Sequence, residues 1–166
     1  SMTRNLAYHG IDRVVFVNAH GGNVEHLREV GRRLRDDGTL YAVEWMWDES
    51  IPGLIDEFFE RPGPHGGPKE TSMLLHLNRE NVAEDRIEDA RDGGLPDVES
   101  HDYRTHGSRT FYDAIDNTAN GVLGDQTDAS VEAGAELFDA ARTQLVSLIE
   151  WLDDQPRDDL MAKPHV

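Results

Sequence analysis

Residues 14–23 read Val-Val-Phe-Val-Asn-Ala-His-Gly-Gly-Asn, and they set the fold class. The run from Val14 to Val17 is β-branched or aromatic and is too short for a core helix, so it predicts a buried strand. From Asn23 the apolar residues recur at helical spacing, and Asp36-Asp37-Gly38 ends that pattern. We therefore expect a strand, a tight turn and then a helix with Asn23 at its N-cap.

A second strand is predicted at residues 40–47, which read Leu-Tyr-Ala-Val-Glu-Trp-Met-Trp. Strand, helix and strand joined by short connections form a βαβ unit, so the two strands should be parallel neighbours. The pattern downstream predicts a short helix at 54–59, a helix at 70–77, a strand at Phe111–Ile115 and a turn at 121–125.

The longest predicted helix covers Ala129 to Leu152. Its expected apolar stripe is formed by Val131, Ala135, Phe138, Leu145, Leu148, Ile149 and Leu152. With 166 residues and no linker-like segment, the chain suits a single α/β domain over residues 1–152, followed by a charged tail at 153–166.

Acidic residues dominate the composition. Asp plus Glu number 33 against 16 for Lys plus Arg, which gives a formal net charge of −17. Such a negative field excludes nucleic-acid backbones and anionic membranes as partners. The acidic, lysine-poor chain is typical of a salt-adapted, halophilic protein, although an ordinary acidic protein from a low-salt cytoplasm has the same balance.

The chain contains no cysteine, which leaves His, Asp, Glu and Asn as candidate metal ligands and favours Zn, Mn or Fe. No apolar run reaches the roughly 18 residues needed to cross a bilayer, and we expect no signal peptide before the first strand. Ser1 before Met2 is typical of the scar that tag removal leaves. We expect a cytoplasmic protein.

His20 lies where open α/β sheets bind their ligands, just past the carboxyl end of a strand and before a helix. Gly21 and Gly22 leave the backbone bare, so that a ligand can approach closely. The alternative is a tight turn whose histidine only hydrogen-bonds to the backbone.

A second candidate constellation reads His65-Gly66-Gly67-Pro68-Lys69-Glu70-Thr71-Ser72. His65 ends a loop rich in Pro and Gly, and Glu70 falls in the first turn of the next helix, where the helix dipole favours an acid in any case. This loop can meet the His20 loop. Two histidines and a carboxylate are the side chains that a metal hydrolase uses.

Three further residues have weaker claims. Trp47 can line a substrate pocket, although large aromatics that alternate at a strand end, here Trp45 and Trp47, more often belong to a core or an interface. His101 and His106 flank Asp102 and can bind metal, or they can be solvated surface residues.

Three segments together resemble the creatininase family. Residues 18–23 resemble its Asn-Gly-His-Gly-Gly-Asn motif, with Ala19 in place of Gly. Residues 65–72 resemble its His-Ala-Gly and Glu-Thr-Ser motif, with Gly66 in place of Ala. Residues 121–125 resemble its Gly-Val-x-Gly-Asp motif, and all three motifs stand in the family's order.

The resemblance implies a three-layer α/β/α domain with a mainly parallel sheet, assembled as a homo-oligomer, a hexamer in the family. It also implies two divalent metal ions that activate water for attack on a small-molecule amide, either a cyclic amide or a formamide. On this basis His20 and Glu70 are metal ligands, and His65 is a catalytic proton shuttle or carbonyl-polarising group. Gly21, Gly22, Asn23 and Trp47 are expected at the substrate.

Two departures from the family pattern qualify these expectations. No Glu-x-His-Gly metal-binding segment is present, so the fold is expected to be truncated at its N-terminus and to hold one metal ion or none. Gly22 stands where creatinine hydrolases have Glu, as in the branch with a formamide hydrolase and a peptide-processing member. The alternative to an active hydrolase is an inactive remnant that oligomerises and binds at most one metal ion or a small ligand.

Overall fold

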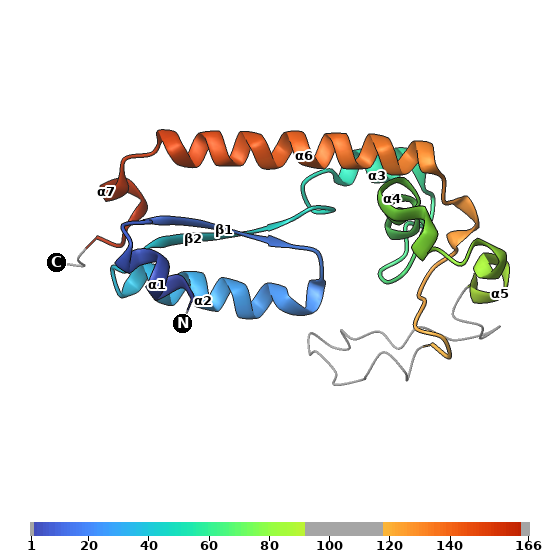
Figure 1. Ribbon diagram of the computed structural model, residues 1–166, viewed down its shortest axis with the longest axis horizontal. Helices are drawn as coiled ribbons and strands as arrows, with labels where there is room; N and C mark the ends of the chain where they lie inside the picture. Colours follow the sequence, from blue (N-terminus) through green and yellow to red (C-terminus); the bar gives the residue numbers. More distant parts are fainter. Residues whose placement is uncertain (1, 92–117, 164–166) are drawn as a thin grey trace, which may run out of the picture. The chain divides into compact units, whose positions relative to one another are not determined.

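The computed structural model describes residues 2–91 and 118–163, whose contacts form two compact units (Figure 1). The first unit contains residues 1–51 and 140–166, and the second contains residues 52–139. The single domain over 1–152 with a separate tail stays a prediction.

A two-stranded parallel sheet forms the centre of the first unit. Strand β1 (Arg13–Asn18) pairs with β2 (Tyr41–Met46), and Val15 lies opposite Val43. Between them come the 3-10 helix η1 (Gly21–Asn23) and helix α2 (Val24–Asp36). The predicted strand–helix–strand unit and the parallel pairing are therefore confirmed. A short helix that the sequence did not predict, α1 (Met2–Tyr8), precedes β1.

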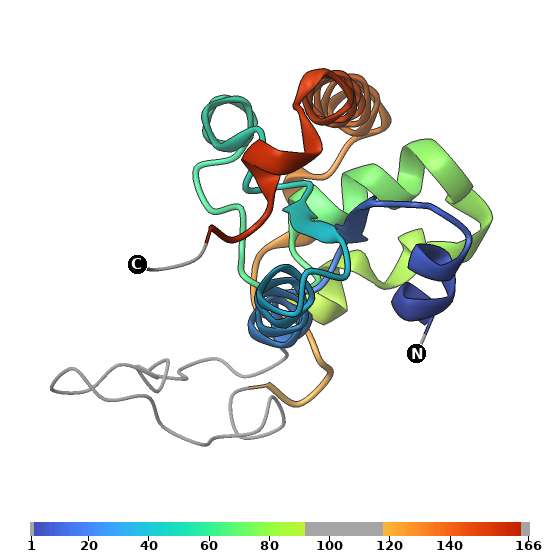
Figure 2. The same ribbon diagram turned by 90° about the vertical axis from the view of Figure 1, so that its left-hand side faces the viewer.

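Helices cover both faces of this sheet. Helix α2 packs closely against β2, because a Cβ added at Gly31 would lie only 3.0 Å from the carbonyl oxygen of Ala42. Residues 140–154 of helix α6 (Val131–Asp154) lie on the opposite face (Figures 1 and 2). The α/β fold class is confirmed, with the sheet as the middle layer.

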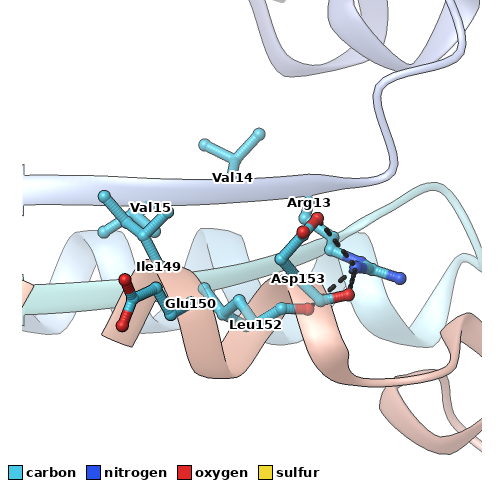
Figure 3. Close-up of a pocket in the computed structure, with 7 residues that line it drawn as sticks. All are labelled: Arg13, Val14, Val15, Ile149, Glu150, Leu152 and Asp153. Carbon is cyan, nitrogen blue, oxygen red and sulfur yellow. Dashed lines mark hydrogen bonds and ion pairs between the residues drawn. The ribbon is translucent and has the colours of Figure 1, made fainter. Parts of the chain in front are cut away.

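Arg13 ties the start of β1 to the end of α6. Its guanidinium donates to the carbonyl oxygens of Leu152 and Asp153, both at 2.8 Å, and to that of Gln155 at 2.7 Å (Figure 3). Leu152 and Asp153 belong to the last turn of α6, where no intrahelical N–H is available to their carbonyls, and Gln155 follows the helix directly. The arginine therefore acts as a C-terminal cap supplied by the sheet.

A hollow of about 290 Å³ lies next to this cap. Val15 of β1 and Ile149 of α6 are among its lining residues (Figure 3). None of the predicted site residues lines it. Helix α7 (Arg157–Leu160) follows α6 and ends at the buried Leu160, and the next residue, Met161, is also buried.

The second unit is mainly helical. Its elements are α3 (Pro52–Phe58), α4 (Pro68–Asn78), η2 (Arg79–Asn81), η3 (Glu84–Arg86), α5 (Ile87–Ala90), η6 (Gln126–Asp128) and the start of α6. Ile55, Phe59, Leu75 and Leu137 are buried in it. The helices predicted at 54–59 and 70–77 are confirmed.

The buried face of α6 differs from the predicted stripe. Leu152 of the predicted stripe is buried, but Ile149 is 50% exposed, and Ala133, Leu137 and Ala141, which lie outside the stripe, are buried. At the start of the helix the reason is a close helix contact, since a Cβ added at Gly134 would lie 1.9 Å from the carbonyl oxygen of Ser72. Small residues, which carry little weight in a hydrophobic pattern, set the face that packs.

The strand predicted at Phe111–Ile115 lies outside the described residues. Among residues 2–91 and 118–163, no helix combines the length and apolar character required to span a bilayer.

Candidate functional site

The His20 loop is organised around Asn18, the last residue of β1. The side-chain carbonyl oxygen of Asn18 accepts hydrogen bonds from the His20 backbone N–H at 3.1 Å and from the Asn23 side-chain amide at 3.3 Å. Asn18 is only 3% exposed, so the acceptor of both bonds is buried, while the donors His20 and Asn23 lie at the surface. The loop therefore leaves the strand in a fixed direction. Asn23 stands at the N-cap of α2 but makes no side-chain capping bond, because its amide points back to Asn18.

Gly22 lies directly beneath the imidazole of His20. A Cβ added at Gly22 would be 2.9 Å from His20 Nε2 and 3.2 Å from its Cδ2. Any side chain there would displace the ring. The absence of a side chain at Gly22 therefore makes room for the His20 ring. The sequence indicated only that a ligand could approach the bare backbone here.

A buried carboxylate supports Asn18 from the neighbouring strand. Glu44 of β2 accepts a hydrogen bond from Asn18 Nδ2 on Oε1 at 3.1 Å. Its Oε2 is paired with Arg28 Nε of α2 at 3.3 Å, and the Glu44 side chain is 3% exposed. Sequence reasoning gave this residue no role. Glu44 is the one acid in an otherwise mainly apolar strand, and this could have indicated its role, because a buried carboxylate requires partners.

The remaining predicted substrate residues of the first unit lie at its surface or near it. Gly21 and Asn23 are exposed, and Trp47 is half-buried just after β2. The backbone carbonyl of Trp47 accepts a hydrogen bond from Ser50 Oγ at 2.6 Å. Asn23 and Gly22 are brought together with His20, because all three belong to one hydrogen-bonded turn.

His65 and Glu70 belong to the second unit, where one short loop joins them. Glu70, in the first turn of α4, accepts a hydrogen bond from the backbone N–H of Gly66 on Oε2. The His65 backbone carbonyl accepts from Leu123 N–H at 2.7 Å, so the two residues form an isolated antiparallel bridge. The carboxylate is therefore held beside the residue that follows the histidine. His65 itself is exposed, and Glu70 is half-buried.

Glycines allow the His65 loop to pack against residues 121–124. A Cβ added at Gly63, which has φ +67°, would lie 2.7 Å from the carbonyl oxygen of Leu123. A Cβ at Gly67 would lie 2.5 Å from that of Pro62, and one at Gly124 would lie 3.1 Å from the Gly63 Cα. At Gly63 and Gly124, therefore, backbone meets backbone in this contact.

Asp125, the final residue of the third motif, is 8% exposed. The hydroxyl of Thr127, which donates to the Asp125 carboxylate, holds the pKa of that carboxyl below its usual range. Burial acts against this shift, while the Thr127 backbone N–H and Arg91, whose Nε lies 2.9 Å from Oδ2, support it. Asp125 is therefore an anchored anion at the start of η6.

The donor types fit a divalent metal ion, but their number does not complete a site. His20 offers an imidazole in one unit, while His65 and Glu70 offer an imidazole and a carboxylate in the other. Over residues 2–91 and 118–163, no group of three or more His, Cys, Asp or Glu side chains is arranged to hold an ion. Catalytic zinc sites usually take three protein ligands. His101, His106 and Asp102 lie outside the described residues.

A family model described as creatinine amidohydrolase matches residues 1–149. The chain belongs to the creatininase family. Both histidine loops fall inside the matched region of this creatininase-family chain, and so does the third motif at residues 121–125. The resemblance drawn from the motifs is therefore confirmed.

Two curated relatives and one solved structure show how much of the family fold is shared. The mycofactocin precursor peptide peptidase of Mycobacterium ulcerans (strain Agy99) is 36% identical over 76% of this chain and 44% of its own length. The 2-amino-5-formylamino-6-ribosylaminopyrimidin-4(3H)-one 5'-monophosphate deformylase of Methanobrevibacter smithii is 32% identical over 89% of this chain and 58% of its own length. The structure named Creatininase Mn is 25% identical with a TM-score of 0.66, over 93% of this chain and 62% of that one. The chain thus spans less than half the length of the first relative.

Proposed function

We propose that this chain is part of a metal-dependent amidohydrolase that cleaves a C–N amide bond. The family match over residues 1–149, which contains both histidine loops, is the observation that supports this proposal most strongly. The chemistry that a divalent ion supplies in such hydrolases is activation of water for attack on the amide carbon.

Each predicted site residue has a role that its local surroundings support. His20 and Glu70 act as metal ligands, the first with its ring over Gly22 and the second with one oxygen held by the Gly66 N–H. His65, which is exposed, transfers a proton or polarises the substrate carbonyl. Gly21, Gly22, Asn23 and Trp47 contact the substrate.

The substrate class is an amide in which the scissile bond is a formamide, a peptide or a cyclic amide. The two curated relatives are named as a peptide peptidase and a deformylase. Gly22 lacks the carboxylate that the resemblance assigns to creatinine hydrolases, which favours the first two substrates over creatinine.

The metal ligands that the described residues do not supply must come from other polypeptide of the same protein or from a partner chain. The described residues hold no group of three metal ligands, and this observation also supports an alternative to the hydrolase. In that alternative, the chain is an inactive remnant that oligomerises and binds at most one ion or a small ligand.

We also propose that the protein is a homo-oligomer, for which the resemblance implies a hexamer. Among the described residues β1 pairs only with β2, and Val17 of β1 is 64% exposed. Two-stranded sheets with open edges are marginal in water. Light scattering should give a multiple of the 18.7 kDa chain mass, and a monomer would contradict the proposal.

Metal content and turnover test the proposed function together. Two Mn²⁺ or Zn²⁺ ions per chain with hydrolysis of N-formyl or peptide amides supports the hydrolase, and His20→Ala should lose both metal and turnover. One ion or none without hydrolysis supports the inactive remnant. His26→Ala, which removes an exposed histidine on α2, is the matched control and should change nothing.

A further inference from the structure

Glu44 is a carboxylate in the middle of β2 with a side chain that is only 3% exposed. A buried carboxylate is strongly disfavoured unless both oxygens have partners. Here one oxygen faces Arg28 and the other faces Asn18. The bonds to Arg28 and Asn18 therefore offset the cost of burying the Glu44 carboxylate in this strand.

Asn18 relays this contact to the His20 loop. Glu44 can only accept a hydrogen bond, so the Asn18 amide must turn its NH₂ toward it. The other end of the amide, Oδ1, is then fixed toward the His20 N–H and the Asn23 side chain, which both donate. The carboxylate thus determines which way the amide points, and the amide determines the path of the loop.

Arg28 completes the relay from α2. Its Nε lies 3.3 Å from Glu44 Oε2, while its NH2 reaches Glu49 at 3.4 Å. The Arg28 side chain is 59% exposed, so one end of the network meets solvent and the other lies under the loop. Three elements of the first unit, namely α2, β2 and the end of β1, are linked to one turn.

We propose that Glu44 and Asn18 are positioning residues that hold the His20 loop, and with it the imidazole over Gly22. Their importance for metal binding rests on the proposed function, whereas their hold on the loop does not. The competing possibility is that the same bonds only join β1 to β2, in which case their loss would loosen the sheet and the loop alike.

An exchange of the two side-chain types separates these possibilities. N18D places two carboxylates against each other, and E44Q leaves the donor–acceptor pattern ambiguous. In N18D/E44Q the introduced carboxylate can accept from the His20 N–H, from Asn23 and from the introduced amide, whose carbonyl can face Arg28. The double variant has the same net charge as the natural chain. In it, every hydrogen-bond donor again faces an acceptor.

Amide hydrogen exchange without metal is the primary measurement, made on the full chain. We expect the His20 N–H to exchange at least about tenfold faster in N18D and several-fold faster in E44Q, because the bond from Asn18 Nδ2 to the Glu44 carboxylate, which fixes the acceptor of the His20 N–H, is lost or weakened. N18D/E44Q should return to within about threefold of the natural chain. E49Q, which removes the exposed second partner of Arg28, should have no effect.

Several results would overturn the inference. One is a double variant in which His20 is no better protected than in N18D. Another is equal acceleration at the β1 and β2 amides of Val14 and Val43, which would assign the bonds to the sheet alone. If N18D yields no folded protein, recovery of folded protein in N18D/E44Q supports the inference and failure to recover contradicts it.

Calorimetric titration with Mn²⁺ on the same proteins separates this inference from the proposed function. Exchange that follows the expected pattern in a chain that binds no Mn²⁺ contradicts the proposed function and supports the positioning role. Mn²⁺ binding with unchanged His20 exchange in N18D contradicts the positioning role alone.

Discussion

The two histidine loops are held in different ways. The His20 loop depends on side chains, because Asn18 and Glu44 fix its path from below. The His65 loop depends on backbone, because Gly63 and Gly124 let two chain segments touch and the His65 carbonyl bonds to Leu123 N–H. A side-chain network can be altered atom by atom, whereas a glycine contact tolerates no added atom.

This difference predicts that the two loops fail differently. A change in the His20 loop should shift the histidine and leave the fold intact. A change in the glycine contact should lower the stability of the second unit, whether or not a ligand is bound.

Gly63→Ala should have the largest effect. The new Cβ would meet the Leu123 carbonyl oxygen at 2.7 Å, and φ +67° is strained for alanine. We expect a loss of about 3 kcal/mol in the free energy of unfolding. Urea unfolding measures it, with Gly53→Ala as the control, because a Cβ there meets nothing within 4 Å. Equal stability of the two variants would refute the backbone account of the His65 loop.

Gly22→Ala should act on the ligand site and not on the fold. The new Cβ would press on His20 Nε2 at 2.9 Å, and a side-chain ring can move away. We expect unchanged urea unfolding and about tenfold weaker Mn²⁺ binding, equivalent to about 1.4 kcal/mol. Gly21→Ala, where a Cβ meets nothing within 4 Å, should bind as the natural chain does. Unchanged affinity in Gly22→Ala would mean that the ring position is unimportant.

Salt tests the contribution of charge to both units. With a net charge of −17, molar KCl should raise the Tm by several degrees, because screening relieves repulsion among like charges. Thermal melts in 0 to about 2 M KCl measure this. A Tm that does not rise would remove the halophilic interpretation.

Thr127→Val should have the smallest effect, and one that depends on pH. The hydroxyl lowers the pKa of the Asp125 carboxyl in the folded chain, so its stabilising contribution is complete above the unfolded pKa. We expect Thr127→Val to be less stable by about 1 kcal/mol at pH 7. The gap should close below about pH 4, as Asp125 protonates. Urea unfolding from pH 3 to about pH 7 measures it, and a gap independent of pH would contradict the ionic role of Asp125.

Much of the first unit could be predicted because its signals are local. Val14 to Val17, the helical spacing after Asn23 and the second apolar run determined β1, α2 and β2 together with their parallel pairing. The same holds for α4 after Pro68 in the second unit. The motifs also identified the family, which the match over residues 1–149 confirms.

The support of the site could not be predicted, because it depends on register. The pairing of β1 with β2 places Phe16 opposite Glu44 and so brings Glu44 within reach of Asn18, and no local pattern encodes that offset. The packed face of α6 was missed for a related reason. Gly134 fits against the Ser72 carbonyl, a contact between segments far apart in the chain.

Metal affinity in variants of both loops tests the central proposal that His20 and Glu70 are metal ligands. Mn²⁺ affinity is measured by calorimetry for the natural chain, His20→Ala and Glu70→Gln, with Glu136→Gln as the exposed control. Each ligand variant should bind Mn²⁺ at least about tenfold more weakly, and the control should bind as the natural chain does. Affinities of His20→Ala and Glu70→Gln equal to that of the natural chain would contradict the account.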